Sequence, residues 1–176
     1  MDLFRSSELA GSSQDLPGPP LCVLIANETG APVDAARLES AVRLALADSP
    51  YDRGEISVAI VDDRTIHRLN RQFLEHDYPT DVLSFPLVDA PPRLEGEIIA
   101  SLDTAVRYGE EVGWPAADEL LLYVVHGALH LAGYRDKEPD DEARMRAAEW
   151  AVLAKLGVAR GPNDGRWLRC TEDAST

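Results

Sequence analysis

Cysteine and basic residues are scarce in this 176-residue chain, and no apolar run approaches the roughly 18 residues of a membrane span. The two cysteines, Cys22 and Cys170, lie near opposite ends of the chain. The first residues lack the basic patch and apolar core of a secretory signal. We therefore expect a cytoplasmic protein with reduced thiols, no disulfide and no membrane partner.

Positive charge is the second shortage. The 17 lysine and arginine residues are outnumbered by 31 aspartate and glutamate residues, which gives a formal net charge of −14. A protein that binds nucleic acid without regard to sequence needs a basic surface. The composition therefore argues against such a binder, and we expect no DNA partner, although a local basic groove is compatible with this balance.

The hydrophobic content of 45% suffices for one globular domain with a sizeable core. Residues 1–20 contain serine, glycine and several prolines, which predicts a disordered leader. The domain is then expected over 21–158, followed by a polar tail at 159–176.

Helix and strand patterns alternate along the domain. Pro86 falls in an expected strand, which favours an edge position or a bulge there. In the helix that follows Asp62, the spacing predicts that Ile66, Leu69 and Phe73 face inward. The segment 120–132 is apolar almost all round, which predicts a helix buried in the core. The expected strands are 21–27, 55–61, 81–88 and 96–101, and the expected helices begin near 33, 63, 103, 115 and 140.

The most informative motif is HGALHLAGYRD, at 126–136, where the buried helix ends. His126 and His130 are four residues apart, which places both imidazoles on one helix face. Gly133 permits the left-handed residue that ends a helix, so that the chain can bring Asp136 back as a third ligand. These side chains predict a site for one divalent ion with one coordination position open.

Simpler interpretations exist for the same residues. A lone histidine in an apolar helix is usually a hydrogen-bonded core residue, and Asp136 can be a solvated loop carboxylate. Gly127 stands where HExxH zinc hydrolases carry their general base, which argues against a peptidase of that kind. Asp140 and Asp141 lie nearby, and we interpret them as helix caps.

Together with two upstream segments, this motif resembles the YbeY family of single-domain bacterial rRNA maturation factors, described as metal-dependent endoribonucleases. The segments are LNRQFLEHDYPTDVLSFP at 69–86 and GEIIASLDTA at 96–105, in the family's order. The resemblance covers roughly 55–155. It implies an α+β fold in which a small mixed four-stranded sheet packs against about five helices, with the metal in a cleft at one end.

The family pattern HGxLHLxGYDH supplies three histidines to a zinc ion. His126 and His130 match the first two, and Asp136 stands where the family most often has histidine. The resemblance thus implies one Zn²⁺ per chain, held by these three residues, with His126 and His130 as catalytic residues. Two imidazoles and a carboxylate also form the ligand set of non-haem iron sites, so Fe²⁺ or Mn²⁺ is an alternative.

The family usually carries an arginine after the aromatic residue of its LN-x-x-(Tyr/Phe) segment, where this chain has Leu74. An arginine there would suit a phosphate oxygen, which leucine cannot bind. We predict Arg68, Arg71, His76 and Asp81 as substrate-binding residues instead. For the arginines a solvated helix face is the alternative, and for Asp81 a role in shaping the cleft.

The resemblance implies a single-strand-specific, zinc-dependent endoribonuclease that acts in rRNA maturation and ribosome quality control. Its implied partners are rRNA and the small ribosomal subunit, and the sequence carries no signal for an oligomeric state. Two alternatives stay open. One is a ribosome-associated metal-binding factor with little or no nuclease activity, which Leu74 and the acidic composition favour. The other is a hydrolase of another substrate.

Overall fold

The computed structural model describes residues 20–160. Of the expected leader and tail, only Pro20, Ala159 and Arg160 fall within that range, and Cys170 lies outside it. The elements follow one another as β1 (Cys22–Asn27), α1 (Ala35–Leu46), β2 (Arg53–Val61), α2 (Asp63–Leu74), β3 (Val82–Ala90), β4 (Arg93–Ser101), α3 (Leu102–Val112), α4 (Ala116–Leu131) and α5 (Pro139–Lys155).

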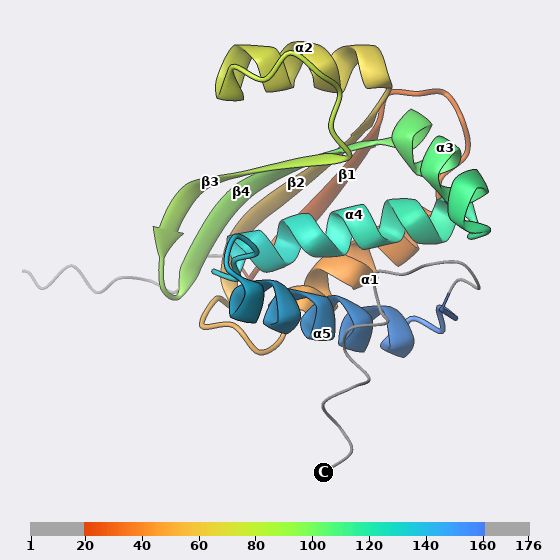
Figure 1. Ribbon diagram of the computed structural model, residues 1–176. Helices are drawn as coiled ribbons and strands as arrows, with labels where there is room; N and C mark the ends of the chain where they lie inside the picture. Colours follow the sequence, from red (N-terminus) through yellow and green to blue (C-terminus); the bar gives the residue numbers. More distant parts are fainter. Residues whose placement is uncertain (1–19, 161–176) are drawn as a thin grey trace, which may run out of the picture.

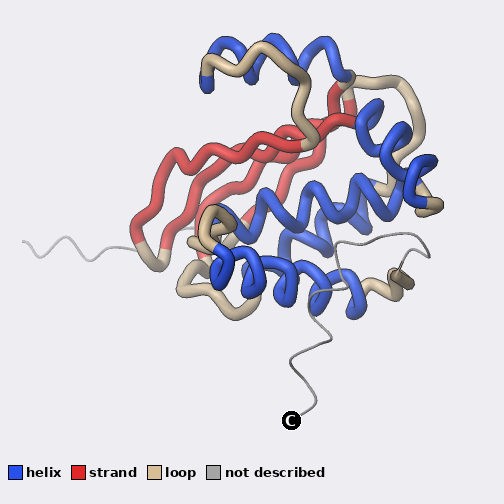
Figure 2. Tube along the Cα trace, viewed as in Figure 1, coloured by secondary structure: helices blue, strands red, loops and turns tan. Residues whose placement is uncertain are grey.

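The four strands form one mixed sheet in the order β1-β2-β4-β3 (Figures 1 and 2). β1, β2 and β4 run parallel, and β3 pairs antiparallel to β4 at the edge. Pro86 therefore lies on an edge strand, and the register of β3 shifts between Pro86 and Val88. Both observations confirm the expected place for a proline in a sheet. The mixed sheet and the helices around it confirm the α+β class.

Helices cover both faces of this sheet, but unequally (Figure 1). α4 and α1 pack on one face with α5 beneath them, and α2 lies on the other face. The main core lies between the sheet and α4, where Ile56, Ile60 and Ile98 are fully buried. A smaller cluster joins α2 to the opposite face through Ile66 and Ile99. α4 is buried along almost its whole length, as its apolar sequence predicts.

The inner face of α2 differs from the expected stripe. Ile66 is fully buried and Leu69 is half-buried, but Phe73 is 57% exposed, so the prediction that Phe73 faces inward is wrong. The inward position belongs to Asn70, four residues after Ile66 and buried as well. Its Nδ2 donates a hydrogen bond to the carbonyl of Tyr78 at 2.8 Å. The helix thus uses a polar side chain to hold the loop that follows it.

The start of α5 also differs from expectation. Glu138 is its N-cap residue and makes no side-chain cap bond, and Pro139 occupies the first helical position. Asp140 and Asp141 therefore lie in the first turn, so their interpretation as caps is wrong. Acidic side chains there interact favourably with the positive end of the helix dipole. None of the helices within residues 20–160 combines the length and apolar composition that crossing a bilayer requires.

Candidate metal centre

A tight turn at the C-terminal end of α4 directs the chain back toward the helix. Gly133 adopts a φ of 96°, which an L side chain rarely tolerates. Its amide donates to the carbonyl of His130, and the amide of Tyr134 donates to that of Leu129, both at 3.0 Å. This is the Schellman pattern that closes a helix. The turn confirms the expected role of Gly133, and it leaves Asp136 beside the helix end.

Three candidate ligand atoms meet at this point. The Nε2 atoms of His126 and His130 lie 2.9 Å apart. Oδ2 of Asp136 lies 3.5 Å from Nε2 of His126 and 3.4 Å from Nε2 of His130. Ligands around one tetrahedral zinc ion are separated by about 3.4 Å, given the bond lengths that zinc takes. The structure therefore brings the three predicted ligands together at a spacing that suits a single ion.

The other ring nitrogens of the two histidines are already engaged. Nδ1 of His130 lies 3.0 Å from the carbonyl of Tyr134, and because a carbonyl only accepts, this nitrogen carries the hydrogen. Nδ1 of His126 lies 2.6 Å from Oε1 of Glu149 and donates to that carboxylate. In the neutral rings both Nε2 atoms then carry lone pairs that point into the same space. These donor atoms fit a cation, because a positive ion between them would relieve the repulsion between the two lone pairs.

Glu149, on α5, is a residue of the site that the sequence analysis missed. Its side chain is 0% exposed and lies between His126 and Arg146, whose guanidinium donates to Oε2 at 3.1 Å. A carboxylate behind a histidine ligand fixes the ring orientation and increases its basicity. The sequence holds one signal for this role. Glu149 follows Met145 by four residues and precedes Val152 by three, so that a charged residue occupies the apolar face of α5.

Gly127 lies between the two histidines on the side of α4 that packs against the sheet. A Cβ atom at this position would lie 2.9 Å from Cγ2 of Ile98 and 3.3 Å from Cγ2 of Val82. A side chain at residue 127 would thus point at the sheet and not into the space beside the histidines. The general base that HExxH enzymes carry at this position has no room here.

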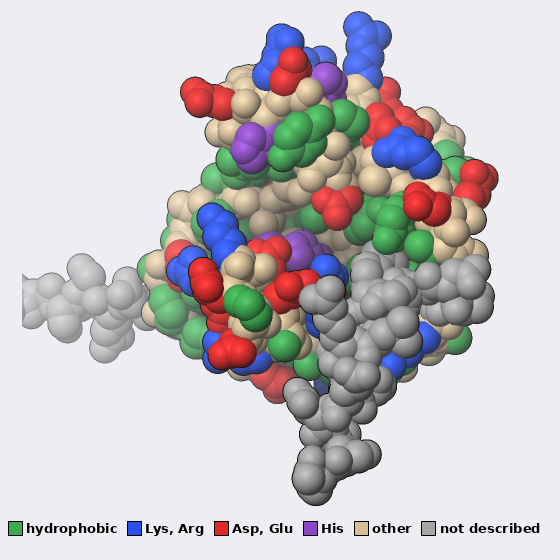
Figure 3. All heavy atoms as spheres, viewed as in Figure 1, with side chains coloured by type: hydrophobic (Ala, Val, Ile, Leu, Met, Phe, Trp, Pro, Cys, Tyr) green, Lys and Arg blue, Asp and Glu red, His purple; other side chains and the backbone are tan. Residues whose placement is uncertain are grey.

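The metal centre opens into a cleft with two adjoining lobes, each of about 530 Å³. Figure 3 shows the hollow, with histidine, acidic and basic atoms at its base. Four residues line both lobes: Thr80, Asp81, His126 and Asp136. The first lobe is completed by Tyr78, Pro79, Thr104, Tyr108, Glu119, Leu122, Tyr123, Arg146 and Glu149, and the second by Leu74, Val82, Leu83, Ser84, Pro86, His130, Leu131 and Lys137.

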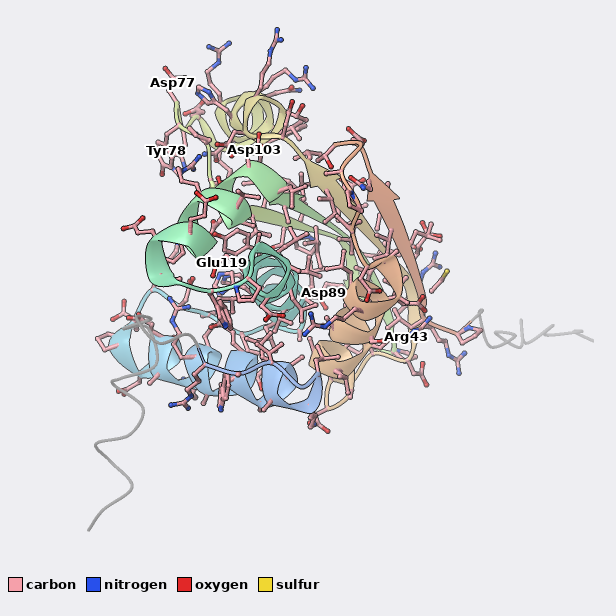
Figure 4. All side chains as sticks on the ribbon, turned by 90° about the vertical axis from the view of Figure 1, so that its right-hand side faces the viewer. Arg43, Asp77, Tyr78, Asp89, Asp103 and Glu119 are labelled. Atoms are coloured by element: carbon pink, nitrogen blue, oxygen red, sulfur yellow. The ribbon has the colours of Figure 1, made fainter. Side chains whose placement is uncertain are left out.

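Of the four predicted substrate-binding residues, one lines the cleft and three do not. Asp81 is exposed and lines both lobes. His76 lines neither lobe, but its ring stacks on that of Tyr78, with centroids 5.4 Å apart and planes 12° from parallel. Tyr78 does line the first lobe, from the loop after α2 (Figure 4). Arg68 and Arg71 are exposed on α2 and line neither lobe.

A polar network fastens α2 to α3 at the edge of the cleft. Asp63 accepts hydrogen bonds from Ser101 at 2.5 Å, Thr104 at 2.6 Å and Arg107 at 2.8 Å. Partial burial by itself raises the pKa of Asp63, but these three hydrogen bonds outweigh it and lower the pKa below its ordinary value of 3.8. The ionised carboxylate is therefore part of what holds the two helix starts together, and Thr104 in turn lines the first lobe.

Comparisons with known proteins agree with this geometry. The family model described as "Endoribonuclease YbeY" matches residues 24–157. The endoribonuclease YbeY of Rhodopirellula baltica is 48% identical over 130 residues, which are 72% of this chain and 67% of that protein. The endoribonuclease YbeY of Roseiflexus castenholzii is 43% identical over 148 residues, 78% of this chain and 93% of that protein.

A solved structure is similar as well. The solution structure of TM1509 from Thermotoga maritima shares 28% sequence identity at a TM-score of 0.53, over 76% of this chain and 88% of that one. The family model begins at residue 24, within β1, and runs past the end of α5, so it includes the two histidines, Asp136 and Glu149. This chain belongs to the endoribonuclease YbeY family.

Proposed function

We propose that this protein is an endoribonuclease that cuts single-stranded RNA in rRNA maturation and ribosome quality control, with one Zn²⁺ held by His126, His130 and Asp136. The observation that carries the proposal is the convergence of two imidazole Nε2 atoms and a carboxylate oxygen, no more than 3.5 Å apart, at the base of a cleft. Family membership supports RNA as the substrate class. We further propose a cytoplasmic protein that acts on the small ribosomal subunit.

Zinc suits this ligand set because catalytic zinc sites combine three protein ligands, often imidazoles with one carboxylate, and leave a position open. Fe²⁺ and Mn²⁺ are the alternatives, since the same ligands also hold iron. Bound there, the ion would stabilise negative charge on a phosphoryl oxygen and increase the acidity of water. The protein's own contribution is orientation: Glu149 and the Tyr134 carbonyl hold the two imidazoles in place before substrate arrives.

The shape of the cleft supports a preference for unpaired RNA. A volume of about 530 Å³ is that of a pocket for a small ligand, so each lobe suits a single nucleotide better than a base-paired helix. The two lobes share the metal centre. A strand can therefore cross the centre with nucleotides on both sides of the phosphodiester that is cut.

The residues predicted to bind substrate contribute at different places. Asp81 lines both lobes, and its carboxylate would accept hydrogen bonds from ribose hydroxyls or base amino groups. His76 would act through its stack with Tyr78. Arg68 and Arg71, which lie outside the lobes, would contact only RNA that extends beyond the cleft and over α2.

The function is tested with an end-labelled rRNA fragment that contains both unpaired and paired segments. We expect cuts in the unpaired segments and no cutting by His126→Ala. Products that retain 2′,3′-cyclic phosphate would indicate attack by the ribose 2′-hydroxyl, and other ends would indicate attack by water.

Absence of RNA cleavage would contradict the proposal. Combined with ribosome co-sedimentation that survives His126→Ala, it would support a metal-binding ribosome factor, which the net charge of −14 favours. Cleavage of a peptide panel in place of RNA would support a hydrolase of another substrate.

A further inference from the structure

The first lobe is acidic, although the proposed substrate is a polyanion. Asp81, Glu119, Asp136 and Glu149 all line it. Of the described residues that line this lobe, Arg146 on α5 is the single lysine or arginine. Among these described residues, Arg146 is therefore the one cationic side chain that a phosphodiester entering the lobe would meet.

Arg146 contacts the buried carboxylate of Glu149 on one side and lines the open first lobe on the other. Its guanidinium donates to Oε2 of Glu149, which is fully buried, while 27% of the Arg146 side chain remains exposed. A guanidinium has five N–H donors in one plane. Within residues 20–160 Glu149 is its hydrogen-bonding partner, so donors are left for a ligand in the lobe.

Building on the proposed endoribonuclease function, we propose that Arg146 binds a phosphate oxygen of the RNA strand in the first lobe. A planar guanidinium matches the oxygens of a phosphate and can bind two of them at once. The contact with Glu149 holds one edge of the group in place, so that less conformational entropy is lost when the other edge binds. The surrounding carboxylates repel phosphates elsewhere in the lobe. The RNA strand can therefore bind only with a phosphate placed beside Arg146.

A purely structural Arg146 would behave differently. It would act through Glu149 and His126 alone, and its removal would change RNA binding only as far as it changed the bound metal. An arginine that touches phosphate contributes to binding without metal, and it also contributes to the salt dependence of binding.

The test measures the binding of a fluorescein-labelled oligouridylate of 2′-O-methyl ribonucleotides, by fluorescence anisotropy over a series of salt concentrations. Each protein is measured with Zn²⁺ and again in excess chelator. Arg144→Gln is the matched control: it removes the same charge from the same helix, but Arg144 pairs with Asp141 and lines neither lobe of the cleft.

We expect Arg146→Gln to weaken binding about tenfold, with and without metal, because a charge-assisted hydrogen bond is lost. The slope of log affinity against log salt should fall by about 0.7, the value for one phosphate contact on a single strand. Arg146→Lys keeps a cation beside Glu149, so its affinity should be intermediate. Arg144→Gln should change binding by less than about twofold.

Equal affinities and salt slopes for Arg146→Gln and Arg144→Gln would overturn the inference. A defect of Arg146→Gln that disappears in chelator would also overturn it, since Arg146 would then act through the metal centre. If the wild-type protein cuts RNA while either result holds, only the role of Arg146 fails. If the wild-type protein neither binds nor cuts RNA, the proposed function fails, and the role of Arg146 with it.

Discussion

Oε1 of Glu149 lies 2.6 Å from Nδ1 of His126, and the Glu149 side chain is fully buried. This contact joins α5 to the end of α4 and fixes the direction in which His126 presents Nε2. The carbonyl of Tyr134 does the same for His130 from the turn at Gly133. We therefore expect the affinity of the centre for metal to depend on groups that would not touch the ion.

Glu149→Gln tests that support directly. The variant loses the carboxylate that contacts both His126 and Arg146, so we expect metal affinity to fall by about 10- to 100-fold. Competition with a coloured zinc chelator measures the change. Glu142→Gln, at an exposed position in the first turn of α5, is the control. Equal zinc affinities for the two variants would contradict the orienting role of Glu149.

Asp136 is tested as a ligand by two substitutions of opposite effect. Asp136→Ala removes the third donor, and we expect zinc to be held at least about tenfold more weakly. Asp136→His supplies a nitrogen donor in its place and should retain the metal. The control is Asp140→Ala, an exposed carboxylate in the next helix. If wild type, Asp136→Ala and Asp136→His hold zinc equally well, Asp136 is not a ligand.

A side chain at Gly127 should destabilise the fold, although alanine favours a helix over glycine by about 1 kcal/mol. In Gly127→Ala the new Cβ would press against Ile98, so we expect the free energy of unfolding to fall by about 1–3 kcal/mol. Urea unfolding measures this change. Gln72→Ala, at an exposed helical position, should stay within about 0.5 kcal/mol of wild type. A Gly127→Ala variant as stable as wild type would show that α4 does not pack this closely.

The Asp63 network predicts a pH-dependent contribution to stability. Because the pKa of Asp63 in the fold lies below 3.8, the ionised group stabilises the protein at higher pH. This contribution is lost as the pH falls below 3.8 and through the pKa in the fold. Asp63→Asn should therefore lower the free energy of unfolding at neutral pH by roughly 1–3 kcal/mol. The difference from wild type should shrink in acid.

The pH dependence distinguishes the loss of the ionised Asp63 carboxylate from a general destabilising effect of the substitution. Asp48→Asn changes an exposed carboxylate and should leave stability nearly unchanged at every pH. A stability loss in Asp63→Asn that stays constant from neutral pH to well below 3.8 would contradict a contribution from the ionised group.

Features with a local cause could be predicted from the sequence. The four-residue spacing of His126 and His130, with a glycine at the helix end, predicts that the chain returns Asp136 toward the two histidines, because helix geometry and the left-handed turn act over a few residues. Pro86 lacks the amide hydrogen that an interior strand needs, which is why an edge position or a bulge could be predicted from one residue.

Features that depend on tertiary packing could not be predicted. Glu149 lies 23 residues from His126 along the chain, and periodicity gives the face of α5 it occupies but not the histidine it meets. The same limit applies to Phe73. Its spacing suits an inward position, yet the buried residue is Asn70, whose side chain donates a hydrogen bond to the distant loop at Tyr78. Arg146 enters the cleft only through the packing of α5 against α4.

We propose that His126, His130 and Asp136 hold one divalent ion. The metal content of protein purified without added metal, measured by inductively coupled plasma mass spectrometry, tests this claim. We expect about one ion per chain in the wild-type protein and none in His126→Ala, with unchanged far-ultraviolet circular dichroism. A wild-type protein without metal, or the same metal content in His126→Ala, would contradict the claim.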